Sequence, residues 1–531
     1  HTETIVPPEV RWTAALPKMV ASNNWVVAGS KTRSGRAMLA NDPHLEGNRL
    51  PNVWYEAVLE TPERYAIGAT MPGLPGLLLG RSSDLAWGAT YTFMDAVDSW
   101  VEDCRDGQYR RVVDGKEEWL PFIRREETIQ RKGLEPHQVS FYENEHGTLN
   151  QAPDSDGYYL ATRWASSLSG GESLNRISEM WSATSVTQGM EILGGLETSW
   201  NWVLADSAGH IGYQMSGLMP RRREGVSGLV PVPGWLPEND WQGFVPPDQL
   251  PRAYDPEAGY FVTANQDLNA WGLAKPINMP MGAYRAERIS ELLEQSDQLT
   301  VRDFQQIQLD RLSPQARAFM ALLRPLLPQT DNGCLLRDWD CCYEPDSKGA
   351  MLFERVYAEL VHQVFGAGLG ADVCSTLQQE TGILADFYAN FDQILLSDHS
   401  PWFGGESREK VYRRAIEHGL EGEVRPWGSQ NRFIMRHLLF GGKFPPAAGF
   451  DHGPLPIPGG RATPQQGQIY RSGGRETSFV PSFRLVTDFA AAGTHTCLLG
   501  GPSDRSLSKW YTSEVANWQQ GVYKYLAPIK I

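Results

Sequence analysis

The stretch that decides the fold is Ser22-Asn23-Asn24-Trp25-Val26-Val27-Ala28-Gly29-Ser30, followed closely by Asn41-Asp42-Pro43-His44-Leu45. The apolar run from Trp25 is bounded by Asn and Gly residues, which is typical of a short buried strand. A Ser-Asn-x-Trp start, a strand and a following Asn-Asp-Pro-His together indicate a serine that self-cleavage would place at a new amino terminus.

Such a serine would carry its own base. A serine hydroxyl is a weak nucleophile and needs an adjacent group to take its proton. A free α-amine has an ordinary pKa of about 7.7–8.0 and is therefore partly neutral near pH 7. The small Ala21 leaves room for the Ser22 hydroxyl to attack the preceding carbonyl. The alternative is that Ser22 is only a turn or capping serine ahead of a strand.

Composition describes an acidic globular chain. Its 531 residues are 41% hydrophobic and 21% charged, with a formal net charge of −15. This charge argues against a nucleic-acid partner, which usually requires a basic face. No stretch of about 18 apolar residues predicts a membrane span. No signal peptide begins at His1, but a start after processing would also remove one, so export is not excluded.

Cysteines are sparse, and none form a CxxC pair, so a zinc site is not expected. Cys334, Cys341 and Cys342 could hold one disulfide in an exported protein, or they are buried thiols. The chain is also rich in tryptophan, with 18 residues. These favour core packing, although tryptophans also line apolar or sugar-binding clefts.

Strand and helix patterns divide the chain into blocks. Residues 1–21 are expected to be a spacer, and residues 22–531 one large α+β domain. Strands are predicted over 22–105 and 106–165, as a hairpin over 201–214, and again over 479–489 and 494–499. Residues 216–258 favour loops. A helical block is predicted over about 283–420, with helices over 283–295, from 304, and over 316–327, 351–365, 377–396 and 409–418. The two strand blocks should join one sheet system, because unpaired strand edges are unfavourable.

From Ser22 to the C-terminus the sequence resembles the β-subunit of the penicillin acylase family of N-terminal nucleophile hydrolases. The matching segments, besides the two already quoted, are Pro72-Gly73-Leu74-Pro75-Gly76, Ala86-Trp87-Gly88-Ala89-Thr90, Asp206-Ser207-Ala208-Gly209-His210-Ile211-Gly212-Tyr213, Pro231-Val232-Pro233-Gly234 and Gly259-Tyr260-Phe261-Val262-Thr263-Ala264-Asn265. The resemblance implies a four-layer αββα fold with a helical insertion. It also implies hydrolysis of an amide that joins an acyl group to an amine.

The same resemblance implies roles for five residues. Ser22 would be the nucleophile after cleavage of the Ala21–Ser22 bond. Asn265 and the backbone N–H of Tyr91 would stabilise the oxyanion, for which a side-chain amide is a suitable donor. His44 matches a histidine near the nucleophile in members that act on cephalosporins and acyl-homoserine lactones. Arg285 matches an arginine that supports the active site. The plainer alternatives are a turn asparagine, a structural histidine and a surface helix arginine.

Several positions near this set have less definite roles. Asn23 adjoins the nucleophile, where its side chain or backbone could hold the free amine. Arg484 and Asp488 lie in a strand where some family members place a carboxylate paired with the active-site histidine. The sequence does not decide which position corresponds.

A structural calcium ion is also implied by the resemblance. Asp95-Ala96-Val97-Asp98 resembles the calcium segment of the family, in which two aspartates and a carbonyl bind the ion, so Asp95, Val97 and Asp98 are the expected ligands. Oxygen ligands suit calcium. The sequence departs from the family pattern between Asn265 and Arg285, where no aspartate supplies the later carboxylate and Asn278 is the nearest polar residue.

The expectation is thus a periplasmic or secreted amidohydrolase with an α-subunit partner from the same precursor. The resemblance implies small-molecule substrates that are N-acyl amides, either β-lactams with an acyl side chain or N-acyl-homoserine lactones, and no nucleic-acid or membrane partner. Two alternatives remain. One is a catalytically silent family member that acts as a binding or scaffold protein. The other is a Trp-rich carbohydrate-binding β-protein, with aromatic platforms on an exposed sheet and no cleft around Ser22.

Overall fold

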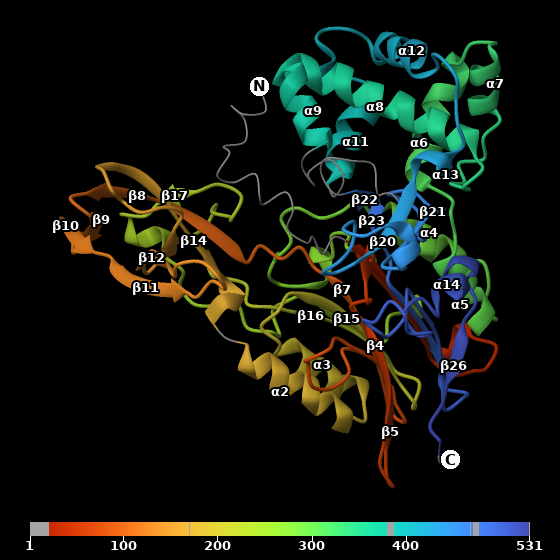
Figure 1. Cartoon of the computed structure of the whole chain (residues 1–531), viewed down its shortest axis with the longest axis horizontal. Helices are drawn as coiled ribbons and strands as arrows, with labels where there is room; N and C mark the ends of the chain where they lie inside the picture. The colour runs from red at the N-terminus through yellow and green to blue at the C-terminus, as the bar shows by residue number, and fades with distance from the viewer. Residues whose placement is uncertain (1–20, 169, 380–386, 468, 471–476, 530–531) are drawn as a thin grey trace.

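A computed structural model of the chain describes residues 21–168, 170–379, 387–467, 469–470 and 477–529. Residues 1–20 of the predicted spacer lie outside this part. Ala21 is already the first residue of a strand, one residue ahead of the expected boundary. Four layers of helix and sheet form the centre of the molecule, with a separate sheet on one side and a helical block on another (Figure 1).

The first central sheet brings together strands from both ends of the chain. Its main order is β19-β1-β2-β24-β25-β26, and β23 pairs with β2 and with β22. The bounds are β1 (Ala21–Val27), β2 (Met38–Glu46), β19 (Tyr260–Thr263), β22 (Ile469–Tyr470), β23 (Thr477–Pro481), β24 (Phe483–Asp488), β25 (Thr494–Leu498) and β26 (Lys524–Leu526). The prediction that the two strand blocks share one sheet system is therefore confirmed.

The second central sheet contains the predicted hairpin. Its order is β18-β16-β15-β7-β6-β5-β4. The bounds are β4 (Tyr55–Glu60), β5 (Tyr65–Thr70), β6 (Leu79–Ser82), β7 (Leu85–Tyr91), β15 (Trp200–Asp206), β16 (Ile211–Ser216) and β18 (Arg252–Tyr254). Strands β15 and β16 pair antiparallel from Trp200 opposite Ser216 to Ala205 opposite Ile211. The Asp206 carboxylate closes their turn by accepting from the N–H groups of Gly209 and His210.

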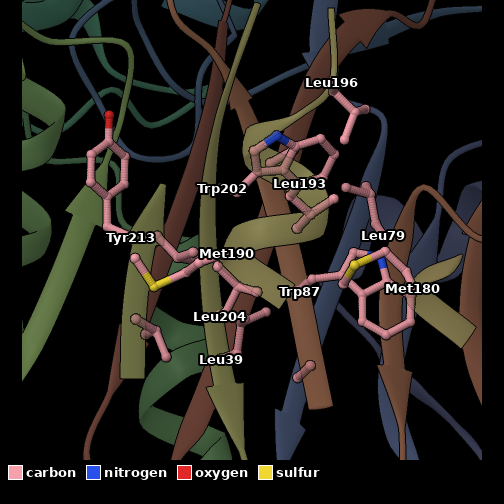
Figure 2. Packing of buried hydrophobic residues seen from close by; sticks show 14 of the residues in the cluster. Leu39, Leu79, Trp87, Met180, Met190, Leu193, Leu196, Trp202, Leu204 and Tyr213 are labelled. Carbon is pink, nitrogen blue, oxygen red and sulfur yellow. The ribbon is translucent and has the colours of Figure 1, made fainter. Parts of the chain in front are cut away.

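The two sheets pack face to face through one continuous apolar core. Val26 and Leu39 of the first sheet belong to the same buried cluster as Val203 and Leu204 of the second. Helices α2 (Gly171–Glu179) and α3 (Val186–Gly194) lie against the other face of the second sheet. Figure 2 shows side chains from this cluster, labelled Leu39, Leu79, Trp87, Met180, Met190, Leu193, Leu196, Trp202, Leu204 and Tyr213.

Helices also cover the outer face of the first sheet. Helices α4 (Tyr284–Leu293) and α5 (Val301–Gln308) place Ile289 and Phe304 in a second cluster with Trp25 and Val486 of that sheet. The predicted αββα layering is thereby confirmed. Helix α5 was predicted from residue 304 and begins at Val301, after a capping box in which the side chains of Thr300 and Asp303 bond each other's backbone N–H groups.

The helical block has a core of its own. It comprises α6 (Pro314–Leu323), α7 (Asp331–Arg337), α8 (Lys348–Leu369), α9 (Ala371–Gln379), α11 (Tyr388–Leu396) and α12 (Arg408–Gly419). The helix predicted over 377–396 corresponds to the end of α9 and to α11. The residues between them lie outside the described ranges. No helix of the described residues is long and apolar enough to cross a membrane.

An eight-stranded lateral sheet, a three-stranded sheet and two short α-helices are the other sheets and α-helices of the described residues. The lateral sheet has the order β10-β9-β8-β14-β13-β12-β11, with β17 pairing β8. Its strands are β8 (Val97–Arg105), β9 (Gln108–Val113), β10 (Lys116–Pro121), β11 (Ile123–Ile129), β12 (His137–Asn144), β13 (Gly147–Leu149), β14 (Gly157–Trp164) and β17 (Val232–Pro233). The other sheet and the short helices are β3 (Arg49–Leu50), β20 (Arg432–His437), β21 (Asp451–Pro456), α13 (Trp427–Gln430) and α14 (Val515–Gln520). All six cysteines are free thiols.

Candidate active site

Ser22 lies at the start of β1, between two neighbouring strands, and is 4% exposed. Its backbone N–H donates to Asn265 Oδ1 over 2.8 Å. Its hydroxyl donates to the Ala21 carbonyl oxygen over 2.5 Å. The nucleophile predicted from the sequence therefore lies against the peptide group that precedes it, and Asn265 holds the nitrogen of the same peptide bond.

Asn265 reaches this position because β19 ends in an unusual backbone turn. Its φ of 69° is in the left-handed region, which asparagine tolerates better than most residues. β19 pairs with β1 so that Thr263 lies opposite Asn24. The turn directly after this pair brings the Asn265 side chain to the first residues of β1. Its Nδ2 donates to the Tyr91 carbonyl over 2.8 Å.

Tyr91 comes from the second sheet, where it is the last residue of β7. The two sheets approach closely here because Gly88 has no side chain, and a Cβ on it would lie 2.7 Å from Asn24 Oδ1. Asn41 ties the sheets together, since its amide exchanges two hydrogen bonds with the backbone of Ala89. The carbonyl of Tyr91 thus joins the predicted site, next to the N–H group that the sequence proposed.

Arg285 is a buried residue that binds the backbone and side-chain oxygens around Ser22. It lies on α4 with no exposed surface, unlike the surface arginine that was the alternative. Its two terminal nitrogens donate to the carbonyl oxygens of Ser22 and Ala264, over 2.8 and 2.6 Å. They also donate to the side-chain oxygens of Asn23 and Asn265. Burial lowers the pKa of Arg285 to about 10, which still leaves the guanidinium charged near neutral pH.

His44 belongs to the layer behind the nucleophile. The register places it opposite Ala21, and side chains alternate along a strand, so its ring and the Ser22 side chain lie on opposite faces of the sheet. Its Nδ1 lies 2.6 Å from Gln466 Oε1, and its Nε2 lies 3.1 Å from Asp42 Oδ2. The structure brings His44 beside the site without a contact to the Ser22 hydroxyl.

Gln466, from the C-terminal part of the chain, is the hydrogen-bond partner of His44. The sequence did not predict this residue. Its Nε2 donates to the Arg461 carbonyl over 2.8 Å, so its oxygen is the atom that faces the histidine. The two positions singled out from the strand lie elsewhere. Arg484 is buried against Cys497 and the Trp518 carbonyl. Asp488 accepts a hydrogen bond from the Ser34 hydroxyl at the end of β24.

A small apolar cavity of about 40 Å³ opens beside Ser22. Its lining includes Pro43 next to the serine and otherwise apolar side chains from both central sheets and the helical layer beyond them: Leu45, Trp54, Met71, Leu78, Leu79, Ala89, Ile177, Leu196, Trp200 and Trp202. The carbohydrate-binding alternative predicts no cleft at Ser22, and the cavity argues against it. An apolar group bound here would lie next to the serine hydroxyl.

The expected calcium ligands are paired with an arginine instead. The Arg222 guanidinium donates to Asp98 Oδ2 over 2.7 Å, to the Asp95 carbonyl over 2.9 Å and to Asp95 Oδ1 over 3.0 Å. Calcium takes six to eight oxygen ligands. Among the described residues, no group of three His, Cys, Asp or Glu side chains could hold a metal ion. As arranged, these residues do not fit a calcium ion.

Comparisons with known proteins find similar sequences over most of the chain. The sequence profile of a family described as penicillin amidase matches residues 2–527. The chain is 28% identical to an acyl-homoserine lactone acylase, QuiP, of Pseudomonas syringae pv. tomato, covering 95% of the chain and 66% of that protein. It is also 28% identical to the penicillin acylase 2 proenzyme of Pseudomonas sp. strain SE83, covering 94% of the chain and 66% of the proenzyme. The chain thus spans about two thirds of the length of these curated relatives.

A solved structure shares the fold. The thermostable penicillin G acylase from Alcaligenes faecalis superposes with a TM-score of 0.74 at 18% sequence identity, covering 95% of the chain and 96% of that structure.

Proposed function

Because the chain belongs to the penicillin amidase family, we propose that it is the catalytic part of an enzyme that hydrolyses N-acyl amides through Ser22. One observation carries the proposal. The hydroxyl and N–H of Ser22 and the Asn265 side chain lie at the Ala21–Ser22 peptide bond, beside an apolar cavity, and the Arg285 guanidinium binds both Asn265 and the Ser22 carbonyl.

Maturation would use the same groups as catalysis. The Ser22 oxygen attacks the Ala21 carbonyl carbon, the C–N bond breaks, and the proton of the hydroxyl passes to the departing nitrogen. Water then hydrolyses the resulting ester, which leaves Ala21 with a carboxylate and Ser22 with a free amine and hydroxyl. The short contact between the hydroxyl and the Ala21 oxygen supports this route, because it holds the attacking atom at the reacting carbonyl group.

In the mature enzyme, the α-amine of Ser22 would act as the base. It takes the hydroxyl proton as the oxygen attacks the amide carbonyl of the substrate, and it returns a proton to the leaving amine. Asn265 Nδ2 would turn from the Tyr91 carbonyl to the developing oxyanion, which the Tyr91 N–H would also stabilise. Water then releases the acyl group from Ser22.

Arg285 and His44 would position these groups without touching the substrate. Arg285 donates to both the Ser22 carbonyl and the Asn265 side-chain oxygen. Because the side-chain oxygen of Asn265 accepts from Arg285, the side-chain nitrogen of Asn265 is the atom that can donate to the oxyanion. His44, held between Gln466 and Asp42, would support the strand segment around Ala21.

The apolar lining of the cavity supports a substrate that the enzyme recognises through an apolar acyl group. Binding pockets for small molecules are usually larger, about 300–1,000 Å³, so a β-lactam acyl side chain or the chain of an N-acyl-homoserine lactone would have to enlarge this one. Met71 is a member of its wall, and a methionine side chain has three rotatable bonds that let it adapt to a ligand. The names of the relatives support both substrate groups, as acyl-homoserine lactone acylase and penicillin acylase.

A second chain from the same precursor would complete the enzyme, in the periplasm or outside the cell. The relatives are longer than this chain by about a third of their length. Leu438, Leu439 and Phe444, which lie between β20 and β21, are exposed by 50–63%. Contiguous exposed apolar surface often marks a contact with another chain, so this segment supports a partner.

The test is to express the full precursor and determine its amino termini by mass spectrometry, with Ser22→Ala and Ser34→Ala beside it. Ser34 is exposed and serves as the control. The parent and the Ser34→Ala variant should be cut before Ser22 and should release the acyl group from a panel of N-acyl-homoserine lactones and penicillins. The Ser22→Ala variant should do neither. Equal cutting of the Ser22→Ala variant would contradict self-processing, and an uncut, inactive parent would favour the silent scaffold protein.

A further inference from the structure

We propose that the guanidinium of Arg222 is the resident cation of the Asp95–Asp98 segment, so that this protein folds and works without a divalent metal ion there. The inference does not depend on the proposed function, because it concerns the stability of the junction between the central sheets and the lateral sheet. It rests on the contacts, burial and close packing of four described residues.

The three charged side chains are removed from solvent together. The exposed fractions are 7% for the Arg222 side chain, 8% for Asp95 and 6% for Asp98. Buried carboxylates require opposite charge and hydrogen bonds, because desolvation otherwise makes their ionised form costly. One guanidinium meets this need for both carboxylates at once, since its planar donors point in several directions.

Together with Arg222, two other donors bind three of the four carboxylate oxygens. The Gly228 N–H donates to both oxygens of Asp95, over 3.1 and 3.0 Å. The indole N–H of Trp241 donates to Asp98 Oδ2, the oxygen that also accepts from Arg222. Both oxygens of Asp95 and one of Asp98 are therefore already hydrogen-bonded to nitrogen donors.

Gly228 packs closely against two of the expected ligand atoms. A Cβ placed on Gly228 would lie 2.1 Å from the Val97 carbonyl oxygen and 2.3 Å from Asp95 Oδ1. An ion in that position would collide with the Gly228 backbone. Val97 was the expected carbonyl ligand, and its oxygen faces this glycine.

The cluster holds a junction that leads to the active site. Asp95 follows β7, which ends at Tyr91, and its backbone N–H donates to the Pro276 carbonyl over 2.7 Å. Met94 forms a bridge with Ile277, in the segment between Asn265 and Arg285. Asp98 lies in β8, the strand that begins the lateral sheet. Through Asp95 and Asp98, Arg222 therefore links its own loop to the segment between β7 and β8 and to the segment that contains Pro276. A bound ion could otherwise fix the relative positions of these three parts.

The experiment measures thermal unfolding of the full processed protein in EDTA and in excess Ca²⁺, together with its calcium content by mass spectrometry. Three proteins are compared: the parent, Arg222→Ala and Arg221→Ala. Arg221 is the exposed neighbour and provides the matched control. For the parent and for Arg221→Ala we expect no bound calcium and the same Tm in EDTA and in Ca²⁺.

Arg222→Ala should behave differently from both. It leaves two buried carboxylates without their cation, so its Tm in EDTA should fall by on the order of 5 °C. Ca²⁺ should then raise its Tm more than that of the other two proteins. In this variant the ion can occupy the space that the guanidinium leaves and can neutralise the two carboxylates. A Tm of the parent that falls in EDTA and recovers in Ca²⁺ would overturn the proposal. So would an equal response of all three proteins to Ca²⁺. If Arg222→Ala does not fold, the EDTA response and calcium content of the parent still decide.

Discussion

The backbone conformation of Asn265 separates two roles of that residue. Its left-handed φ costs little for glycine but strains an alanine by about 1 kcal/mol or more. We predict that Asn265→Gly and Asn265→Ala both lower kcat on an N-acyl amide by about 10²–10³, because both remove the oxyanion donor. Both variants should also lose the stability that Asn265 Oδ1 gives as an acceptor for Ser22 and Arg285, and the alanine variant should lose more because its backbone is strained. Steady-state kinetics and chemical unfolding of the processed proteins separate the two effects, and full activity of the glycine variant would refute the assigned role.

Arg285 should matter for stability before any chemistry occurs. It donates to four oxygen atoms from inside the protein. Lysine cannot reproduce a planar fork of donors. In a Ser22→Ala background, we expect Arg285→Met to cost about 1.5–3 kcal/mol of unfolding free energy or more, as for the loss of buried hydrogen bonds to a charged group, and Arg285→Lys to cost less.

Arg288 lies one turn further along α4 and provides the control. It pairs with Asp310 at 12% exposure, so Arg288→Met should cost less than Arg285→Met. Urea unfolding measures all three variants. Equal losses at both positions would show that the Arg285 contacts add nothing beyond a partly exposed ion pair.

Residues of the site differ in how well the sequence could reveal them. Ser22, Asn265 and Arg285 lie within short motifs that resemble a family, and the structure brings these three together. Gln466 and Arg222 have no such local signal. Each acts through a partner more than 100 positions away in the sequence, so only tertiary packing identifies them.

At the scale of the element, strands were easier to predict than short helices. The apolar runs at β1, β2 and β7 mark the strands. Their bounds were less predictable, because β1 begins before Asn23 and Asn24, and β2 continues through Asn41, Asp42 and Pro43 to Glu46. Helices α2 and α3 were not predicted. Each has nine residues, and α3 contains Gly189, which lowers helix propensity. Gly189 is required by packing, since a Cβ there would lie 2.4 Å from a methyl group of Leu204.

Asp392, in helix α11, makes the stability of the protein depend on pH. Burial raises the pKa of Asp392 to about 7, although the Tyr357 hydroxyl and Gln315 Nε2 donate to its oxygens over 2.8 Å each. In the unfolded chain its pKa is about 3.9. The folded protein therefore holds a proton that the unfolded chain releases, and this stabilisation is lost as pH rises from about 4 to about 7.

The prediction concerns Asp392→Asn, which cannot ionise. Relative to the parent, this variant should be more stable near pH 8 than near pH 5, by on the order of 1–4 kcal/mol. Asp398→Asn is the control, because that side chain is 80% exposed. Chemical unfolding at both pH values measures the difference. A constant difference between Asp392→Asn and the parent would show that Asp392 does not titrate in this range.

At the scale of the molecule, the helical block is an insertion within one sheet. β19 and β24 both belong to the sheet that holds Ser22, yet residues 314–419 between them form a helical block with a separate core. The sequence predicted this arrangement because the change from strand to helix patterns is sharp. It could not predict that Tyr91 crosses from the second sheet to Asn265, because that contact depends on how closely the two sheets pack.

The position of β24 beside β2 has a consequence for the timing of protein synthesis. Asn41 lies opposite Leu485, and β2 is also the neighbour of β1. A ribosome must translate the whole segment from Asn41 to Leu485 before β24 can emerge and pair with β2. If Ser22 is released as proposed, a polypeptide that ends before Leu485 would stay uncut, so the appearance of the new terminus would report that synthesis had passed β24.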